Sequence, residues 1–446
     1  MMTSFYSGVS GIKAQQYALD VIANNIANVN TTGYKQQRVS FSDLLSQTIS
    51  GASGATSTKG GTNAKQIGLG VSIASIDTLM TAGSTQSTGV ATDLSIGGSG
   101  FFIVQGGSVG KYQFTRNGAL DVDEDGNVTI NGYKVCGWQA YTVDADGNYV
   151  YNTDADVEPL NIYSDSYNGN KKIIAAKAST EATFNGNLDP SATASGTALN
   201  DIGTVSDFDQ TSTITVYDAQ GNSYDVTVNW KKCYVDDTTS TTSWYWELDT
   251  TNTSLSLSPA SGYVEFDSSG KIITTDATNY NSAPSITMTP SGVGTAAFNV
   301  TLDFGDVGTS VSSSTASVTG VADGYESGEL QSISISSDGT IIGIYSNDQT
   351  QALGMIALAT FTNPEGLEKI GNNLYVTSAN SGAFTGGVVA GSSGTGSLSS
   401  GTLEMSNVDL AEQFSSMMIS QRAYQANSKV ITASDECLQS LINMIR

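Results

Sequence analysis

The chain has 446 residues, of which 39% are hydrophobic and only 13% are charged, and its 42 acidic residues outnumber its 18 basic ones. Most of the acidic excess lies between the two ends of the chain, so we expect an acidic, water-facing body there and no nucleic-acid binding. The chain contains no histidine, which excludes acid–base catalysis and metal ligation by that residue.

Near the N-terminus, apolar side chains recur at alternating spacings of four and three residues. These positions are Phe5, Val9, Ile12, Leu19, Ala23 and Ile26, with the polar Gln16 among them. The spacing predicts an amphipathic helix over residues 3–31. We expect it to end near Thr31-Thr32-Gly33, because glycine can stop a helix at its C-terminus. Residues 1–33 are therefore assigned to an N-terminal assembly helix.

A connector and a first β domain are expected next. Residues 34–70 form the connector, whose Gly- and Ser-rich part over 42–70 indicates an extended or flexible segment. Apolar alternation from Val71 and the run Phe101-Phe-Ile-Val predict strands. Turn signals at Asp125-Gly-Asn, Asn131-Gly and Asp146-Gly-Asn predict successive hairpins, so residues 71–179 form the first part of this domain.

A second β domain is expected to be inserted in the first, over residues 180–323. Alternating stretches on both sides of Ala219-Gln-Gly-Asn predict a hairpin of Thr211–Tyr217 with Ser223–Trp230. Trp244, Tyr245 and Trp246 predict another strand, whose rings are core or cross-strand contacts rather than a ligand site. Residues 324–385 then return to the first domain through a hairpin at Asp338-Gly, and the Gly- and Ser-rich residues 386–403 form a second connector.

The last segment, residues 404–446, predicts a long C-terminal assembly helix. A count of four and three places apolar residues at one narrow seam, which consists of Leu410, Phe414, Met417, Tyr424, Ile431, Leu438, Ile442 and Ile445. The polar seam positions Gln421, Ser428 and Asp435 would weaken a dimeric coiled coil but suit a larger, partly wet assembly. The predicted fold class is mainly β and multidomain, with two nested β domains on a coiled-coil-like helical base formed by both chain ends.

Motifs for catalysis or cofactor binding are not found. The chain lacks a Walker loop, a dinucleotide fingerprint, a nucleophile elbow and a zinc pattern, so we expect no catalytic residue, no cofactor and no metal. The acidic stretch from Asp121 resembles the start of a calcium loop, but its twelfth position is Gly132 and its flanks favour strands, so a hairpin turn is preferred. Asp144-Ala-Asp-Gly-Asn is interpreted in the same way.

The three cysteines, Cys136, Cys233 and Cys437, are odd in number and far apart. This arrangement argues against a disulfide framework. We also expect neither a membrane-spanning segment nor a cleavable signal peptide, because no apolar run is long enough and no basic segment precedes a hydrophobic core.

Two terminal motifs resemble those of the bacterial flagellar axial proteins of the rod and hook family. In the stretch Ala23–Lys35 the matching residues are Ala23, Asn24, Asn25, Asn28, Thr32, Gly33 and Tyr34; in Ser420–Ile431 they are Gln421, Arg422, Ala423, Tyr424 and Asn427. The stretches 91–104, 114–120 and 371–375 resemble the β domain of the same family. Length and the predicted insertion are more similar to the hook subunits of this family than to its rod or hook-associated members, which remain alternatives.

The resemblance implies a structural subunit that polymerises with itself into a short, curved, flexible tube that transmits torque from rod to filament around an export channel. It also implies partners: the distal rod protein, the hook cap, the hook–filament junction protein, the hook-length control protein and the flagellar type III export apparatus. The subunit would be extracellular, in the flagellar hook, and exported without a cleavable signal. Nucleic acids and small-molecule substrates are not expected. We further expect the terminal helices to order on assembly, because isolated amphipathic helices are marginal in water.

Two interpretations from other classes stay open at this stage. A secreted β-rich adhesin would use the Tyr- and Trp-bearing strands and would be a stable monomer with a ligand. A hydrolase with two carboxylates would need only two acidic residues, and the sequence does not single out a pair among its 42. Neither interpretation accounts for the two terminal seams, so we expect a structural protein rather than an enzyme.

Overall fold

The computed structural model describes most of the chain, in two compact units. The described residues are 2–106, 111–144, 148–164, 171–196, 202, 207–249, 254–273, 282–291, 294–309 and 316–445. The larger unit consists of Met1–Lys171, Ser332–Gly343 and Gln351–Arg446, and the smaller unit consists of Lys172–Gln331 and Ile344–Thr350.

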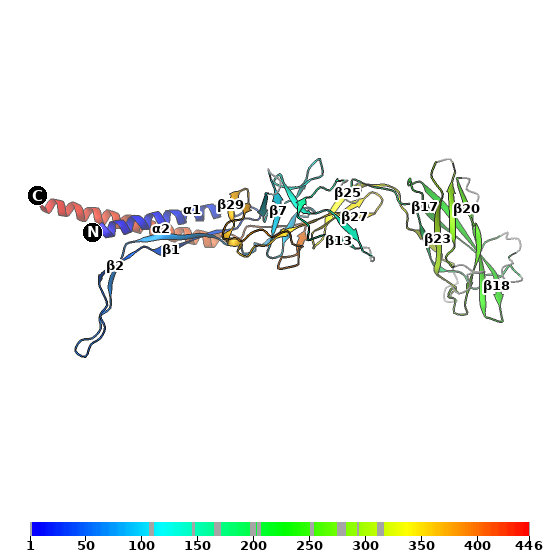
Figure 1. Ribbon diagram of the computed structural model, residues 1–446, viewed down its shortest axis with the longest axis horizontal. Helices are drawn as coiled ribbons and strands as arrows, with labels where there is room; N and C mark the ends of the chain where they lie inside the picture. Colours follow the sequence, from blue (N-terminus) through cyan, green and yellow to red (C-terminus); the bar gives the residue numbers. More distant parts are fainter. Residues whose placement is uncertain are drawn as a thin grey trace. The chain divides into compact units, whose positions relative to one another are not determined.

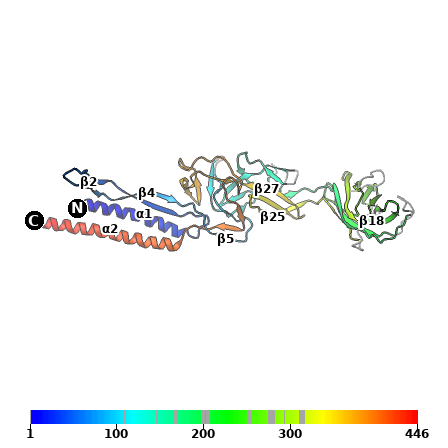
Figure 2. The ribbon, with the colours of Figure 1, turned by 90° about the horizontal axis from the view of Figure 1, so that it is seen from below.

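Two long antiparallel helices lie at one end of the larger unit. Helix α1 spans Met2–Ala27 and helix α2 spans Leu410–Ile445; Figures 1 and 2 show them side by side with both chain termini at the same end. Because α2 has 36 residues and α1 has 26, the last turns of α2 extend beyond α1 (Figure 1).

A narrow antiparallel ladder accompanies the helices. Strand β1 (Gln37–Asp43) pairs with β4 (Val71–Thr78), and both contact α1. Strands β2 (Ser46–Ser50) and β3 (Lys65–Gly68) continue it as a hairpin. We call α1, α2, β1 and β4 together the helical base.

A sheet forms the rest of the larger unit. Strands β27, β11, β7, β8, β30 and β29 lie side by side in that order. Four large side chains of these strands, Phe101, Phe114, Trp138 and Tyr375, are buried together in one core. The strands of this part are β5 (Thr85–Ser87), β6 (Leu94–Ile96), β7 (Phe101–Gln105), β8 (Tyr112–Thr115), β9 (Asp121–Val122), β10 (Val128–Ile130), β11 (Tyr133–Trp138), β12 (Tyr141–Val143), β13 (Tyr149–Tyr151), β14 (Glu158–Pro159), β25 (Gly328–Ile335), β26 (Thr340–Tyr345), β27 (Thr350–Ile356), β28 (Leu358–Ala359), β29 (Glu368–Gly371), β30 (Leu374–Val376), β31 (Leu398–Ser400) and β32 (Thr402–Glu404), with a short 3-10 helix, η1 (Pro364–Gly366).

The smaller unit contains two sheets that share one core. One sheet has the order β20-β22-β23-β16-β24 and the other has the order β17-β18-β19-β21. Residues from both sheets, including Trp230, Trp246 and Phe304, are buried in a common cluster. Its strands are β15 (Ile173–Ile174), β16 (Glu181–Asn187), β17 (Gln210–Tyr217), β18 (Ser223–Asp236), β19 (Thr241–Leu248), β20 (Leu255–Ser258), β21 (Ser261–Phe266), β22 (Ser285–Pro290), β23 (Phe298–Gly308) and β24 (Thr319–Ala322), and the first residues of β25 pair with β15.

The mainly β fold with packed terminal helices is confirmed, as are the strands predicted from alternation. The hairpin around Ala219-Gln-Gly-Asn is formed by β17 and β18, and Asp123 closes the turn after β9 by accepting hydrogen bonds from the backbone and side-chain nitrogens of Asn127, both at 2.7 Å. Residues 145–147, at the predicted turn of Asp146, lie outside the described residues.

The end of the first helix was predicted too late. Helix α1 ends at Ala27 and not near Thr31. Asn28 accounts for the earlier end, because its side-chain amide donates to the carbonyl oxygen of Asn24 at 2.9 Å and so bonds a carbonyl of the last turn.

The connector was predicted to be extended or flexible. It is extended, and strands β2 and β3 within it are paired with each other.

The shared core of the smaller unit gives a first prediction. Phe304 is fully buried and its ring lies 4.9 Å from that of Trp230 and 5.1 Å from that of Phe184. Phe304→Ala should lower the free energy of unfolding by about 3–5 kcal/mol, because it opens a cavity between the sheets. The exposed Val321→Ala on β24 should change it by less than about 0.5 kcal/mol. Thermal unfolding measures both, and equal effects would contradict a core shared by the two sheets.

Candidate assembly site

Small and polar side chains line the face at which the two helices meet. The buried residues of α1 are Gly8, Gly11, Ala14, Ala18 and Asn25, and those of α2 are Gln413, Ser420 and Ser434. A Cβ atom at Gly11 would lie 2.7 Å from the side-chain nitrogen of Asn427, and one at Gly8 would lie 3.3 Å from the side chain of Ile431. The missing side chains therefore allow a close approach of the helix backbones.

The predicted apolar seam is only partly covered within the chain. Phe5, Leu410, Phe414, Tyr424, Leu438 and Ile442 are exposed, Phe414 at 50% and Ile442 at 64%, whereas Val9, Ile12, Leu19, Ile26, Met417 and Ile431 are half-buried. The side chain of Ile445 lies outside the described residues. The exposed positions are not packed on the other helix of the same chain, and their assignment to an assembly interface stays a prediction. Within the chain, close contact of small residues takes the place of that packing.

Asn25 fastens the end of α1 to the rest of the helical base. Its side-chain amide donates to the carbonyl of Gln37 at 2.8 Å and to the side chain of Gln413 at 3.1 Å. Its side-chain oxygen accepts from the backbone nitrogen of Gln37 at 3.0 Å and from the Tyr34 hydroxyl at 3.1 Å. One buried amide thus connects α1, β1 and α2, and all its polar atoms are paired.

The neighbouring motif residues shape the turn after α1. Asn24 accepts a hydrogen bond from the Tyr34 hydroxyl at 2.9 Å, and Thr32 donates to Asn117 at 3.0 Å. Gly33 has a φ of +67°, and a Cβ there would lie 2.6 Å from the backbone of Arg116. Only glycine fits this close approach to the segment after β8. The side chain of Ala23 is exposed.

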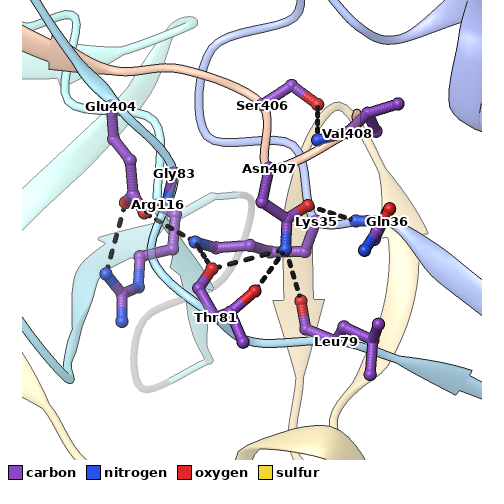
Figure 3. A network of polar contacts seen from close by, with 10 residues as sticks. All are labelled: Lys35, Gln36, Leu79, Thr81, Gly83, Arg116, Glu404, Ser406, Asn407 and Val408. Carbon is purple, nitrogen blue, oxygen red and sulfur yellow. Dashed lines mark hydrogen bonds and ion pairs between the residues drawn. The ribbon is translucent and has the colours of Figure 1, made fainter. Parts of the chain in front are cut away.

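A buried cluster of charges lies directly after this turn (Figure 3). The Lys35 ammonium lies 2.6 Å from one carboxylate oxygen of Glu404, and the Arg116 guanidinium lies 3.2 Å from the other. The side chains of these three residues are 0%, 4% and 2% exposed in the order Lys35, Arg116 and Glu404. Burial lowers the pKa of both Lys35 and Arg116, and the charge of Glu404 acts against that shift. We call these three residues the charge cluster.

Lys369 adds a further cation beside the charge cluster. Its ammonium donates to the carbonyl oxygen of Lys35 at 3.1 Å and lies 4.2 Å above the ring of Tyr34. Burial lowers its pKa to about 8. The face of an aromatic ring is electronegative, so Tyr34 offsets part of the cost of burying this charge.

Asn407 and Asp409 set the start of α2. Asn407 accepts from the backbone nitrogen of Gln36 at 2.7 Å and donates to the carbonyl of Leu79 at 2.9 Å (Figure 3). Asp409 accepts from the backbone nitrogens of Ala411 and Glu412 at 2.8 and 3.2 Å, which is the N-cap arrangement that begins a helix. The first turn of α2 is therefore held to the same strands as the end of α1.

The C-terminal motif divides between the two faces of α2. Ala423 and Asn427 are half-buried, Asn427 next to Gly11 of α1, whereas Gln421, Arg422 and Tyr424 are exposed. Arg422 donates to the side chain of Gln425 at 3.4 Å, a contact within the helix. Asn427 of the motif therefore takes part in the helix pairing inside the chain, and the exposed residues of the motif form part of the outer surface of α2.

Sequence reasoning assigned no role to the charge cluster. Lys35 and Arg116 lie in stretches quoted for the family resemblance, but Glu404 is 369 positions from Lys35, so local spacing could not pair them. The available signal was the scarcity of charge. Only 13% of the residues are charged. In such a chain, a single charged residue within an apolar or small-residue stretch is a candidate for burial beside a residue of opposite charge.

Features of other site classes are few in the described part of the chain. The structure places no group of three or more Cys, Asp or Glu side chains where they could hold a metal ion. Cys136 and Cys233 are buried and Cys437 is exposed on α2; burial raises the pKa of Cys136 to about 12, which disfavours a reactive thiolate. None of the described helices is long and apolar enough to cross a membrane.

Four family models match the chain. They are the flagella basal body rod protein over residues 5–35, the flagellar hook protein FlgE/F/G D1 domain over 95–206, the flagellar basal body protein FlaE D2 domain over 183–325, and the flagellar basal body rod FlgEFG protein C-terminal region over 399–444. The chain is also 38% identical to the flagellar hook protein FlgE of Borreliella burgdorferi over the full length of both chains. It belongs to the flagellar hook protein family.

Other members support this membership. The hook protein FlgE of Treponema pallidum is 37% identical, again over the full length of both chains. The crystal structure of the Helicobacter pylori flagellar hook protein FlgE2 is similar in fold, with a TM-score of 0.50 at 15% identity, over 70% of this chain and 98% of that one. Flagellar hook proteins are structural, so the family does not favour the adhesin or the hydrolase interpretation.

Gly33 gives a second prediction. Gly33→Ala should lower the free energy of unfolding by more than about 2 kcal/mol, because it combines the strain of a positive φ with a clash against the Arg116 backbone. Gly89 has a similar φ of +72° with open space around it, so Gly89→Ala should cost about 1 kcal/mol. Chemical denaturation measures the difference. Equal costs would show that close packing at Gly33 is unimportant.

Lys369 gives a third prediction, on pH dependence. Its folded pKa of about 8 lies below the value of about 10.4 for an unfolded lysine, so between these values the unfolded chain binds more protons and stability rises with pH. Lys369→Met removes this group. From pH 8 to pH 10 the melting temperature of the wild type should rise relative to that of the variant by on the order of 3 °C.

The exposed Lys429→Met on α2 is the control for this measurement and should follow the wild-type profile. Melting curves of the wild type and Lys369→Met that stay parallel over the same pH range would contradict the burial of a charged lysine at this position.

Proposed function

We propose that this chain is a structural subunit of the flagellar hook and that it polymerises through the helical base into a short curved tube. The observation that carries the proposal is the orientation of α2. Its small and polar face is already occupied by α1, and five positions of its apolar seam, Leu410, Phe414, Tyr424, Leu438 and Ile442, are exposed. A second copy of the chain is the occupant that the family supports for this seam.

The exposed seam residues can contribute to cohesion between copies. Phe5, Leu410, Phe414, Tyr424, Leu438 and Ile442 are at least 36% exposed. Burying one such side chain contributes about 1.5–3 kcal/mol, part of which offsets the loss of freedom on association. A groove of about 320 Å³ between α1, β1 and α2 includes Ile22, Phe41 and Ile419 in its lining, and it offers a neighbouring copy a place for an apolar side chain.

We further propose a finer role, which the family resemblance implies. The helices of neighbouring copies line the inside of the tube around a channel, and the acidic β-rich parts lie outside, where they make small, wet contacts that adjust as the hook bends. The tube thereby transmits torque from rod to filament. The proposed partners are the distal rod protein, the hook cap, the hook–filament junction protein, the hook-length control protein and the type III export apparatus.

The fourth prediction tests polymerisation through the seam. The double variant Phe414→Ser with Ile442→Ser changes two exposed positions, so the monomer should melt as the wild type does. The concentration needed for polymerisation should rise at least about a hundredfold, since two buried apolar contacts are lost. Val90→Ser, at another exposed apolar residue, is the control. Sedimentation and electron microscopy give the outcome, and curved tubes formed equally well by the double variant would contradict the role of the seam.

The fifth prediction concerns order in the free subunit. We propose that α1 and α2 become fully ordered on assembly, because the pair exposes an apolar surface and the last turns of α2 have no intrachain partner helix (Figure 1). Limited proteolysis of the monomer should remove residues 410–446 and 1–27 before it cuts the β strands, and polymerised protein should resist this trimming. Ends that resist as well as the core in the monomer would count against ordering on assembly.

A further inference from the structure

Glu404 occupies the place where the helical base joins the sheet of the larger unit. It is the last residue of β32 and lies six positions before the start of α2. Lys35 follows the turn after α1, and Arg116 directly follows β8 of the sheet. One carboxylate is therefore in contact with the chain leaving α1, the chain entering α2 and the sheet.

Each carboxylate oxygen of Glu404 has its own partners. One accepts from Lys35 at 2.6 Å and from the backbone nitrogen of Gly83 at 3.0 Å, and the other accepts from Arg116 at 3.2 Å. The backbone of Glu404 is held as well, because its carbonyl oxygen accepts from the Gly33 nitrogen at 2.8 Å. The main chain of Glu404 is thus fixed to Gly33, and its carboxylate is fixed to Lys35, Gly83 and Arg116. The length of the Glu404 side chain therefore sets the distance between these two groups of contacts.

Few other charges could hold the same parts together. In the described residues of the larger unit, the remaining ion pair joins Arg38 with Asp77 at 3.8 Å; it lies within the β1–β4 ladder and Arg38 is largely exposed, so it contributes little. A buried cluster of two cations on one carboxylate behaves differently, because displacing one member leaves a buried charge unpaired.

We propose that Glu404 is a positioning residue for assembly: it fixes the orientation of the paired helices relative to the sheet of the larger unit, and this orientation sets the curvature and helical repeat of the polymer. The inference rests on the proposed function, since it requires a polymer. Neighbouring copies meet through the helices, so a small rotation of the helical base against the sheet is repeated at every subunit and accumulates along the tube.

The test is a change of side-chain length with the charge retained. Glu404→Asp shortens the side chain by one methylene, about 1.5 Å, so that the carboxylate cannot reach Lys35 and Arg116 together from its fixed main chain. The variant should fold with a melting temperature several degrees lower, and its polymers should show a changed curvature or helical repeat in electron micrographs. Glu365→Asp, the same substitution at an exposed carboxylate, should change neither quantity.

The outcomes separate the inference from the function. If the wild type forms no tubes, the proposed function fails. If Glu404→Asp is destabilised and still forms tubes with wild-type curvature and repeat, the function stands and the positioning role is overturned.

If Glu404→Asp does not fold, the triple variant Lys35→Met, Arg116→Met and Glu404→Met decides, because an apolar replacement of the whole cluster can restore stability without restoring its geometry. A folded triple variant that forms altered tubes or none supports the proposal, and wild-type tubes overturn it.

Discussion

Close packing of small side chains between α1 and α2 determines which surface of the chain is left for assembly. Gly8 and Gly11 bring α1 so near to α2 that a Cβ atom at Gly11 would lie 2.7 Å from the side chain of Asn427 and one at Gly8 would lie 3.3 Å from that of Ile431. Phe414 and Ile442 of α2 remain exposed beside or beyond this contact. Such a subunit pairs its helices closely and still presents exposed apolar side chains to its neighbours. A self-assembling tube requires this combination.

The polar residues at the junction complement this packing. Asn25 connects α1, β1 and α2 through hydrogen bonds that leave none of its polar atoms unpaired, and the charge cluster connects the same elements to the sheet. Buried polar groups are costly when unpaired, so the junction tolerates little rearrangement. Bending of a tube made of such subunits would therefore be expected at contacts between copies rather than at this junction.

Periodicity alone gave the two terminal helices, the mainly β middle and most hairpins, because each of these is encoded by neighbouring residues. It did not give the face at which the helices meet. An apolar count overlooks glycine and serine, yet Gly11 and Ser420 are the kind of residue that allows helices to approach. Nor could it pair Lys35 with Glu404 across 369 positions, since that contact depends on the complete fold. The domain bounds inferred from composition, including 180–323 for the inserted domain, stay a prediction.

We propose that α1 covers one face of α2 and that the apolar side chains of α2 left exposed serve neighbouring copies. The most direct measurement is a cryo-electron microscopy map of the assembled polymer at side-chain resolution. We expect that Gly11 still contacts Asn427 within each subunit, while Phe414, Tyr424 and Ile442 are buried against helices of neighbouring copies. A map in which α1 and α2 of one subunit pair through these apolar residues, or in which they remain exposed in the tube, would contradict it.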